Sequence, residues 1–247
     1  MAYGLTDDLE VRLAESFSVS GNDQDNDLKG TTAQFNSNGF SDPNFGITYR
    51  VIDQRHHEPV DLDFAMSYAP NMISDSAPGG GHDGAESAGG QVAAFGATLG
   101  REMKDFTIAG SATATYHGKR EYEALATDDD ISPNSFWAYE ANLQTQTRIT
   151  SRFSIDAGVA YYDFDNYTAA NQTTGLTWIG RNPDYANFSV GFNYHFIPNR
   201  LVGQLSYNYD LYTTNGELNN YSTPSDNSYI KYEGNNIFGA KLFYTFE

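Results

Sequence analysis

The sequence has no cysteine, which excludes disulfide bonds, thiolate metal sites and a cysteine nucleophile. Basic residues are few: 14 Lys and Arg stand against 32 Asp and Glu, so the formal net charge is −18. Such a surface repels phosphate backbones, and no Lys/Arg cluster offers a local exception, so we expect no nucleic-acid partner. No stretch approaches the roughly 18 consecutive apolar residues that a membrane-spanning helix requires.

Aromatic rings and glycine are abundant in an otherwise polar chain. There are 18 Tyr, 16 Phe and 23 Gly, although the mean hydropathy is −0.54. Apolar residues recur at every second position, which is typical of strands with one apolar face, and helical spacing fits these runs less well. The predicted strands cover roughly residues 9–19, 45–51, 60–68, 91–100, 106–116, 137–149, 153–161, 188–196, 201–211 and 237–246. The facing of the small-residue run 91–100 is ambiguous.

Short and long connections alternate strictly between these runs. The long polar ones cover roughly residues 20–43, 70–89, 118–134, 165–184 and 213–232, whereas hairpin loops usually have about 2–5 residues. With up-and-down strands, every long loop emerges at one end, and both termini lie at the end with the short turns. Outer-membrane barrels habitually have this asymmetry, whereas soluble sandwiches and lipocalin-like barrels have no reason for it.

The number of strands also indicates which face points outward. Eight strands already make an interior that side chains fill, so ten would enclose too much space for an apolar core. We therefore predict an all-β protein with one domain, residues 1–247: a transmembrane antiparallel up-and-down β-barrel of about ten strands. The last strand is expected to pair with the first. A hairpin hidden in 22–43 is the alternative that would raise the count to twelve.

This facing assigns side chains to the lumen and to the membrane interfaces. The predicted lumen-lining residues are Glu10, Arg12, Arg50, Asp61, Asp63, Glu140, Arg148, Asp156, Asp210 and Lys241. Aromatic residues on the other parity gather near the two ends of the strands, as interfacial girdles require. The predicted girdle residues are Tyr68, Tyr116, Trp137, Tyr139, Tyr161 and Tyr209 near the long loops, and Phe106, Phe153, Tyr194, Phe196, Tyr244 and Phe246 near the short turns.

Two stretches resemble the motif pattern of an outer-membrane barrel family associated with the phenol meta-cleavage pathway. They are residues 3–7 (YGLTD) and residues 39–50 (GFSDPNFGITYR). The resemblance covers about the first third of the chain. It implies a porin-like transport barrel in the outer membrane of a Gram-negative bacterium and passage of small, often aromatic compounds, and it supplies no catalytic residue. The last strand also resembles the closing strand that the barrel-assembly machinery reads.

The function predicted from these observations is passive transport of small molecules through a narrow polar lumen, without enzymatic activity. The alternative is a structural or adhesive surface barrel that acts through its long loops and self-assembles. A third possibility is an outer-membrane hydrolase with His117 at the outer rim. Expected partners are the lipid bilayer with lipopolysaccharide and a small-molecule solute. Residues 1–4 do not form a signal peptide, so an exported protein would be numbered here in a mature or trimmed form.

No cofactor is expected, with one hypothesis to the contrary. Asp23, Asp25 and Asp27 alternate like the front of a calcium-binding loop. The EF-hand pattern also requires glycine at its sixth position and glutamate at its twelfth, and here these positions hold Leu28 and Gln34. A solvated acidic loop is therefore the simpler interpretation, and weak Ca²⁺ binding is the alternative.

Overall fold

The computed structural model describes residues 2–15, 17–18, 22–26, 32–36, 39–40, 42–72, 90–119, 122–124, 129–171, 175, 177–197, 200–214, 216–220, 228–230 and 234–244. These ranges form strands and one short 3₁₀ helix, η1 (Gln54–His56). No helix in this part of the chain is long and apolar enough to cross a membrane.

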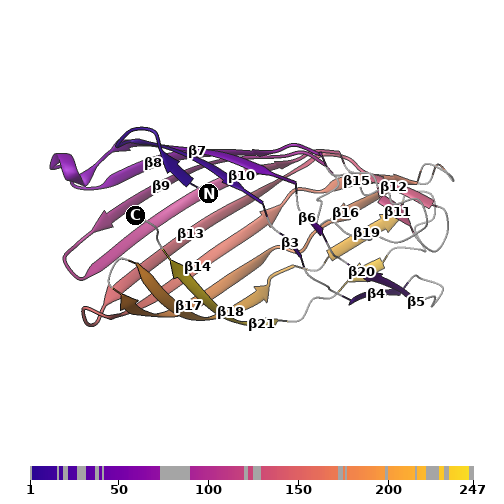
Figure 1. The fold of residues 1–247 in the computed structure, drawn as a ribbon. Coiled ribbons are helices and arrows are strands. Elements are labelled where there is room, and N and C mark those ends of the chain that lie inside the picture. Colours follow the sequence, from indigo (N-terminus) through magenta and orange to yellow (C-terminus); the bar gives the residue numbers. More distant parts are fainter. Residues whose placement is uncertain are drawn as a thin grey trace.

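Ten long antiparallel strands form the wall of a barrel, which confirms the predicted fold (Figure 1). They are β2 (Leu9–Ala14), β7 (Asn44–Ile52), β8 (Asp61–Ala69), β9 (Val92–Glu102), β10 (Phe106–His117), β13 (Phe136–Arg148), β14 (Phe153–Phe164), β17 (Tyr185–Ile197), β18 (Leu201–Tyr212) and β21 (Asn235–Tyr244). Each pairs with the next in chain order. Every predicted run therefore corresponds to one of these strands.

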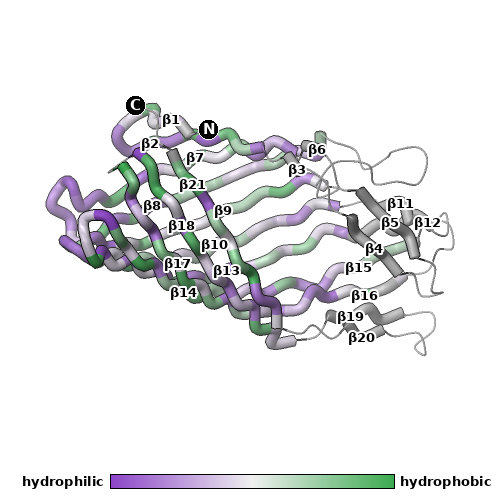
Figure 2. The backbone as a smooth tube through the Cα atoms, turned by 60° about the horizontal axis from the view of Figure 1, so that its bottom comes forward, coloured by the Kyte–Doolittle hydropathy of each residue, from purple (hydrophilic) through white to green (hydrophobic). Residues whose placement is uncertain are grey.

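The edge of β2 differs from the prediction. The short strand β1 (Ala2–Gly4) pairs with the free edge of β2. The sheet therefore has eleven strands: β1 is at one edge, the ten wall strands follow in chain order, and β21 is at the other edge. The Thr6 hydroxyl accepts hydrogen bonds from the backbone N–H groups of Asp8 and Leu9, and this turn folds β1 back onto β2. Among the described residues no ladder joins β21 to β1 or to β2, so the predicted pairing of the last strand with the first is wrong for this part of the chain. The two chain ends nevertheless lie close together at one end of the barrel (Figures 1 and 2).

A second sheet extends the barrel at the opposite end, where the sequence predicted only polar loops. Its six strands form the hairpins that connect β10 to β13, β14 to β17 and β18 to β21. They are β11 (Tyr122–Ala124), β12 (Asp129–Pro133), β15 (Tyr167–Asn171), β16 (Thr177–Arg181), β19 (Gly216–Asn220) and β20 (Ser228–Ile230). Segments such as GELNN have no apolar alternation, so the period-two test cannot detect strands of this kind.

The twelve-strand alternative is wrong, although its hairpin exists. β4 (Asn22–Asn26) pairs with β5 (Thr32–Asn36), and β3 (Phe17–Ser18) pairs with β6 (Gly39–Phe40). Both pairs are separate two-stranded sheets. They do not enter the wall, because β2 is already hydrogen-bonded directly to β7.

The barrel has no hydrophobic core in its described part. Only Phe136, Ala160 and Ala169 are buried apolar residues there, whereas Leu143 is 48% exposed and Phe238 is 80% exposed. Hydrophobic and hydrophilic residues alternate along the long strands (Figure 2). A soluble barrel of this size would bury its large apolar side chains, so the exposed apolar face is the one that suits lipid.

The register of the ladders shows which residues of neighbouring strands share a face of the sheet, because directly paired residues point to the same side. On β9 the cross-strand partners of Phe95 are Met66 and Ala114, which assigns Phe95 to the apolar face and resolves the facing of 91–100. The ladders shift register between Arg50 and Ile52 and between His195 and Ile197. Both shifts lie at the last residues of their strands, at the end with the short turns.

Candidate functional site

The ten predicted lumen-lining residues all lie on the face opposite the exposed apolar one. Cross-strand partners establish this: Arg50 pairs with Asp63, Gln146 pairs with Asp156, and Gln204 pairs with Lys241. We call this face the inner face. Besides the charged residues it carries amides, hydroxyls and small residues, among them Thr48, Ala65, Gly96, Thr113 and Asn142.

The inner face of β10 to β21 encloses a cavity of about 510 Å³, which we call the chamber. One carboxylate, Asp156, and one ammonium, Lys241, lie in its wall. The other inner-face residues that line it are neutral: Thr107, Ala109, Gln144, Gln146, Ser189, Gly191, Gln204, Ser206 and Asn208. This lining can donate and accept many hydrogen bonds, and its surface is more polar than apolar.

Asp156 is held in place by amides from three other strands. Its carboxylate accepts hydrogen bonds from Gln146 Nε2 at 2.8 Å, Asn193 Nδ2 at 2.5 Å and Gln204 Nε2 at 3.3 Å. Gly191 leaves room for this arrangement, because a Cβ there would lie 3.2 Å from Asp156 Oδ2 and 3.4 Å from Gln204 Nε2. Three amide donors hold the orientation of this carboxylate and bring no opposite charge to it.

The opposite wall carries a second, smaller cavity of about 190 Å³. Glu10 and Arg12 of β2 lie beside it, together with small inner-face residues of β7 to β10. Arg50 and Asp63 lie farther along this wall and form a two-pronged ion pair, with Nε–Oδ1 at 2.8 Å and Nη2–Oδ2 at 3.0 Å. On this side, then, opposite charges on neighbouring strands are paired.

Aromatic rings line the inner face near the end that carries the second sheet. Tyr162, Tyr185 and Tyr212 are cross-strand neighbours, with ring centroids 4.5 Å and 5.5 Å apart along the row. Asp210, 8% exposed, lies one row deeper and accepts a hydrogen bond from Asn187 at 2.6 Å. The sequence did not predict this cluster, although its members share the parity of Glu140 and Asp210.

One buried carboxylate, Asp184, connects the tops of these strands. It is 3% exposed and accepts hydrogen bonds from the Phe164 backbone N–H at 3.1 Å and from Arg181 Nη2 at 2.7 Å. The Thr214 hydroxyl donates to the same carboxylate at 3.3 Å and accepts from the Asp184 N–H. Asp184 therefore fixes β14, β16 and β18 relative to β17, beside the aromatic cluster.

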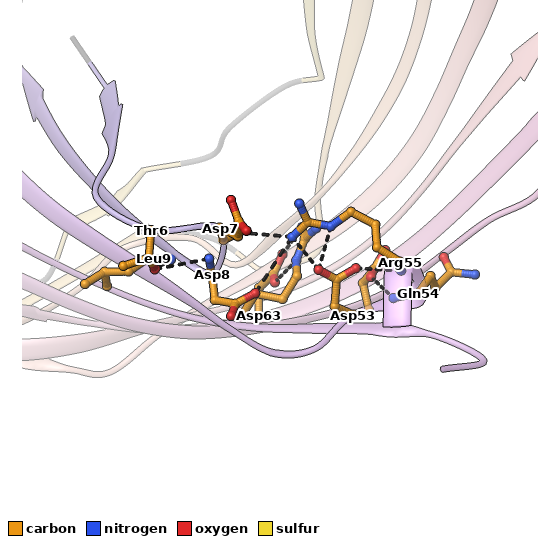
Figure 3. Close-up of polar contacts among 10 residues, drawn as sticks. Thr6, Asp7, Asp8, Leu9, Asp53, Gln54, Arg55 and Asp63 are labelled. Atoms are coloured by element: carbon orange, nitrogen blue, oxygen red, sulfur yellow. Dashed lines mark hydrogen bonds and ion pairs between the residues drawn. The ribbon is translucent and has the colours of Figure 1, made fainter. Parts of the chain in front are cut away.

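A polar cluster organises the turn between β7 and β8 (Figure 3). Asp53, 4% exposed, accepts hydrogen bonds from the Arg55 backbone N–H at 2.7 Å and from Arg55 Nε at 2.6 Å. Arg55 also donates to the Asp7 carbonyl at 3.0 Å, so the same guanidinium reaches the turn between β1 and β2. Gln54 exchanges hydrogen bonds with the backbone of Glu102 on β9. These contacts join three connections at the end with the short turns.

This cluster predicts a dependence of stability on acid pH. The side-chain hydrogen bond from Arg55 lowers the pKa of Asp53 from 3.8 to about 2. A carboxylate with a lowered pKa stabilises the fold fully above its ordinary value and loses that contribution as pH falls toward the lowered one. We therefore expect the wild type in detergent to lose thermal stability more steeply between about pH 4 and pH 2 than Asp53→Asn, because the amide of that variant does not titrate.

Thermal midpoints from circular dichroism across that pH range measure the difference. Glu58→Gln is the matched control, since Glu58 is exposed in the same turn and is expected to leave the acid profile as in the wild type. Equal slopes for the wild type and Asp53→Asn would contradict the assignment.

The predicted girdle residues lie near both ends of the wall. Tyr116 and Trp137 are cross-strand partners near the second sheet, with ring centroids 5.3 Å apart. Phe153 pairs with Tyr194 near the short turns, and Tyr194 contacts Phe196 edge to face at 5.0 Å. Phe246 and the side chain of Tyr244 lie outside the described residues. The girdle assignment stays a prediction.

The calcium hypothesis falls largely outside the described structure. The backbones of Asp23 and Asp25 belong to β4, but their side chains and the whole of Asp27 lie outside the described residues. The part that is described contains no group of three or more His, Cys, Asp or Glu residues arranged to hold a metal ion.

For the hydrolase alternative, the structure shows where the ring of His117 lies. It stacks on the ring of Phe136, with the two ring centroids 4.6 Å apart.

The fold is similar to that of solved outer-membrane barrels. The COG4313 outer membrane channel from Pseudomonas putida F1 is 14% identical with a TM-score of 0.60, over 98% of this chain and 80% of that chain. The Pseudomonas putida toluene transporter TodX is 7% identical with a TM-score of 0.51, over 98% of this chain and 72% of that chain. No protein-family model and no curated protein matches the sequence. These similarities establish the fold as that of an outer-membrane β-barrel.

Proposed function

We propose that the protein is a passive transport barrel for small polar molecules, rather than an enzyme, in the outer membrane of a Gram-negative bacterium. The observation that carries the proposal is the chamber of about 510 Å³ inside a barrel whose inner face is polar. Small barrels are usually filled by their own side chains. Here small and short residues such as Gly191, Ser189 and Ala109 leave space for a solute.

The fold adds support for this role. The two similar structures are described as a channel and a toluene transporter, and we extend the general role of passage to this chain. Lipopolysaccharide at the outer leaflet and the barrel-assembly machinery remain proposed partners. The association with phenol meta-cleavage stays a prediction from the sequence, and the polar chamber favours solutes more hydrophilic than an aromatic hydrocarbon.

Planar-bilayer recordings of the purified protein test passage directly. We expect discrete conductance steps in the wild type and a large loss of conductance in Ser189→Trp, because that ring would fill the chamber. Phe188→Trp is the matched control: the adjacent residue lies on the exposed apolar face, so its ring contacts lipid and the current is expected to stay unchanged. Wild-type conductance in Ser189→Trp would place the path elsewhere, and no conductance in pure wild-type protein would refute the proposal.

A second candidate function is binding of a surface partner by the second sheet. One observation favours it: three long hairpins join into one six-stranded sheet beyond the barrel. Loops that are only solvated do not need to pair with one another in this way. Shortening the β19–β20 hairpin would test it. Loss of binding to cells or of lateral arrays, with conductance retained, would support an adhesive role.

A further inference from the structure

The chamber contains two opposite charges that do not pair with each other. Among the described residues, neither Asp156 nor Lys241 belongs to an ion pair. The hydrogen bonds to the Asp156 carboxylate come from neutral amides, and the structure gives the Lys241 side chain no hydrogen bond within the described part of the chain. On the opposite wall Arg50 and Asp63 do pair, so the barrel brings opposite charges together elsewhere on the same face.

Their separation follows from the order of the strands. Asp156 is on β14 and Lys241 on β21, with β17 and β18 between them. In register, Asp156 lies level with Gly239, two residues before Lys241. Three strand spacings of about 4.8 Å and this offset of about 7 Å place the two backbones about 16 Å apart along the curved wall. The amides of Asn193 and Gln204 occupy this interval and hold the carboxylate, while Lys241 has a long flexible stem. The two charged side chains therefore line the same cavity without forming an ion pair with each other.

We propose that the chamber binds a small zwitterion, whose ammonium group contacts Asp156 and whose carboxylate contacts Lys241. This inference rests on the proposed function, because the solute must enter the lumen. A zwitterion satisfies both charges at once, whereas a simple cation or anion leaves one of them unmatched. The neutral amides and hydroxyls of the chamber then bind the polar middle of the solute.

Glycylglycine has dimensions that suit this arrangement. Two extended residues span about 7 Å, and a charge-assisted hydrogen bond of about 2.8 Å at each end extends the span to about 12–13 Å. The flexible stem of Lys241 lets its ammonium group adjust to the length of the solute. Two capped derivatives of glycylglycine provide matched probes, because N-acetylglycylglycine has no ammonium group and glycylglycine amide has no carboxylate.

Isothermal titration of the full barrel in detergent with these three probes tests the inference. We expect glycylglycine to bind at least about tenfold more tightly than either capped form, since each lost charge pair removes a charge-assisted hydrogen bond. Asp156→Asn and Lys241→Gln should each remove this preference. Lys104→Gln and Asp105→Asn make the same charge changes at exposed positions in the turn between β9 and β10, so they should keep it.

Two results separate this inference from the proposed function. Equal binding of glycylglycine and its two capped forms by a barrel that conducts would overturn the zwitterion site, and passage of solutes would remain supported. Selective binding of glycylglycine by a barrel that shows no conductance would support the site and refute passage. Selectivity retained in both Asp156→Asn and Lys241→Gln would overturn the assignment of these two residues.

Discussion

Replacing Leu143 with arginine is expected to destabilise the barrel by about 2–4 kcal/mol, because arginine near the bilayer midplane costs this much on the lipid face of a transmembrane barrel. Leu143 is 48% exposed and lies midway along β13, between Val159 and Gly110 on the same apolar face. Reversible urea unfolding of the protein in phospholipid vesicles, followed by tryptophan fluorescence, measures the change.

Gln144→Arg is the matched control, because the next residue of β13 lies on the inner face. A charge there faces water, so we expect the free energy of unfolding to change by less than about 1 kcal/mol. If Gln144→Arg were the more destabilising of the two, the apolar face would not be in lipid, and the orientation of the whole wall would be wrong.

The second large effect is expected for Asp184→Ala. The substitution removes the acceptor of hydrogen bonds from the Phe164 N–H, the Arg181 guanidinium and the Thr214 hydroxyl. It leaves these donors at a position that is almost closed to solvent, so we expect a loss on the order of 3 kcal/mol in the free energy of unfolding. Urea unfolding in detergent micelles measures this loss.

The same substitution should also loosen the aromatic cluster. Tyr185 follows Asp184 directly and contacts the rings of Tyr162 and Tyr212, so its ring should gain mobility that is visible in aromatic NMR spectra. Asp165→Ala removes an exposed carboxylate from the segment just after β14, and it should leave both stability and spectra close to the wild type. If Asp165→Ala lowered the free energy of unfolding as much as Asp184→Ala does, the cause would be the loss of a negative charge and not the loss of the hydrogen bonds to Asp184.

The wall of the barrel could be predicted from the sequence because its signal repeats. In β13, residues 137, 139, 141 and 143 are apolar and residues 140, 142, 144 and 146 are polar, and no other secondary structure explains that alternation. The same alternation placed Asp156 and Lys241 on one face. It could not place them in one cavity, because alternation does not show where small inner-face residues such as Ser189 and Gly191 leave space in the lumen.

The parts that the sequence did not predict lack a periodic signal. Tyr185 lies between the predicted connection 165–184 and the apolar run that begins at Phe188, so the pattern assigns it to neither, whereas the structure places it at the start of β17. Asp184 looks like any other acidic residue of that loop, and only its three partners show its structural role. The pairing of β1 with β2 depends on a turn held by the Thr6 hydroxyl, and a three-residue strand is too short for any pattern to indicate.

The two register shifts limit how such a chain can change in length over evolution. Both lie in the last residues of β7 and β17. One extra residue there changes the facing of almost no side chain, because the strand ends directly after it. One residue inserted in the middle of β13 would exchange lipid-facing and water-facing side chains along the rest of that strand. Homologues of this barrel should therefore gain or lose residues within their strands in pairs, and single-residue length changes should be confined to the connections.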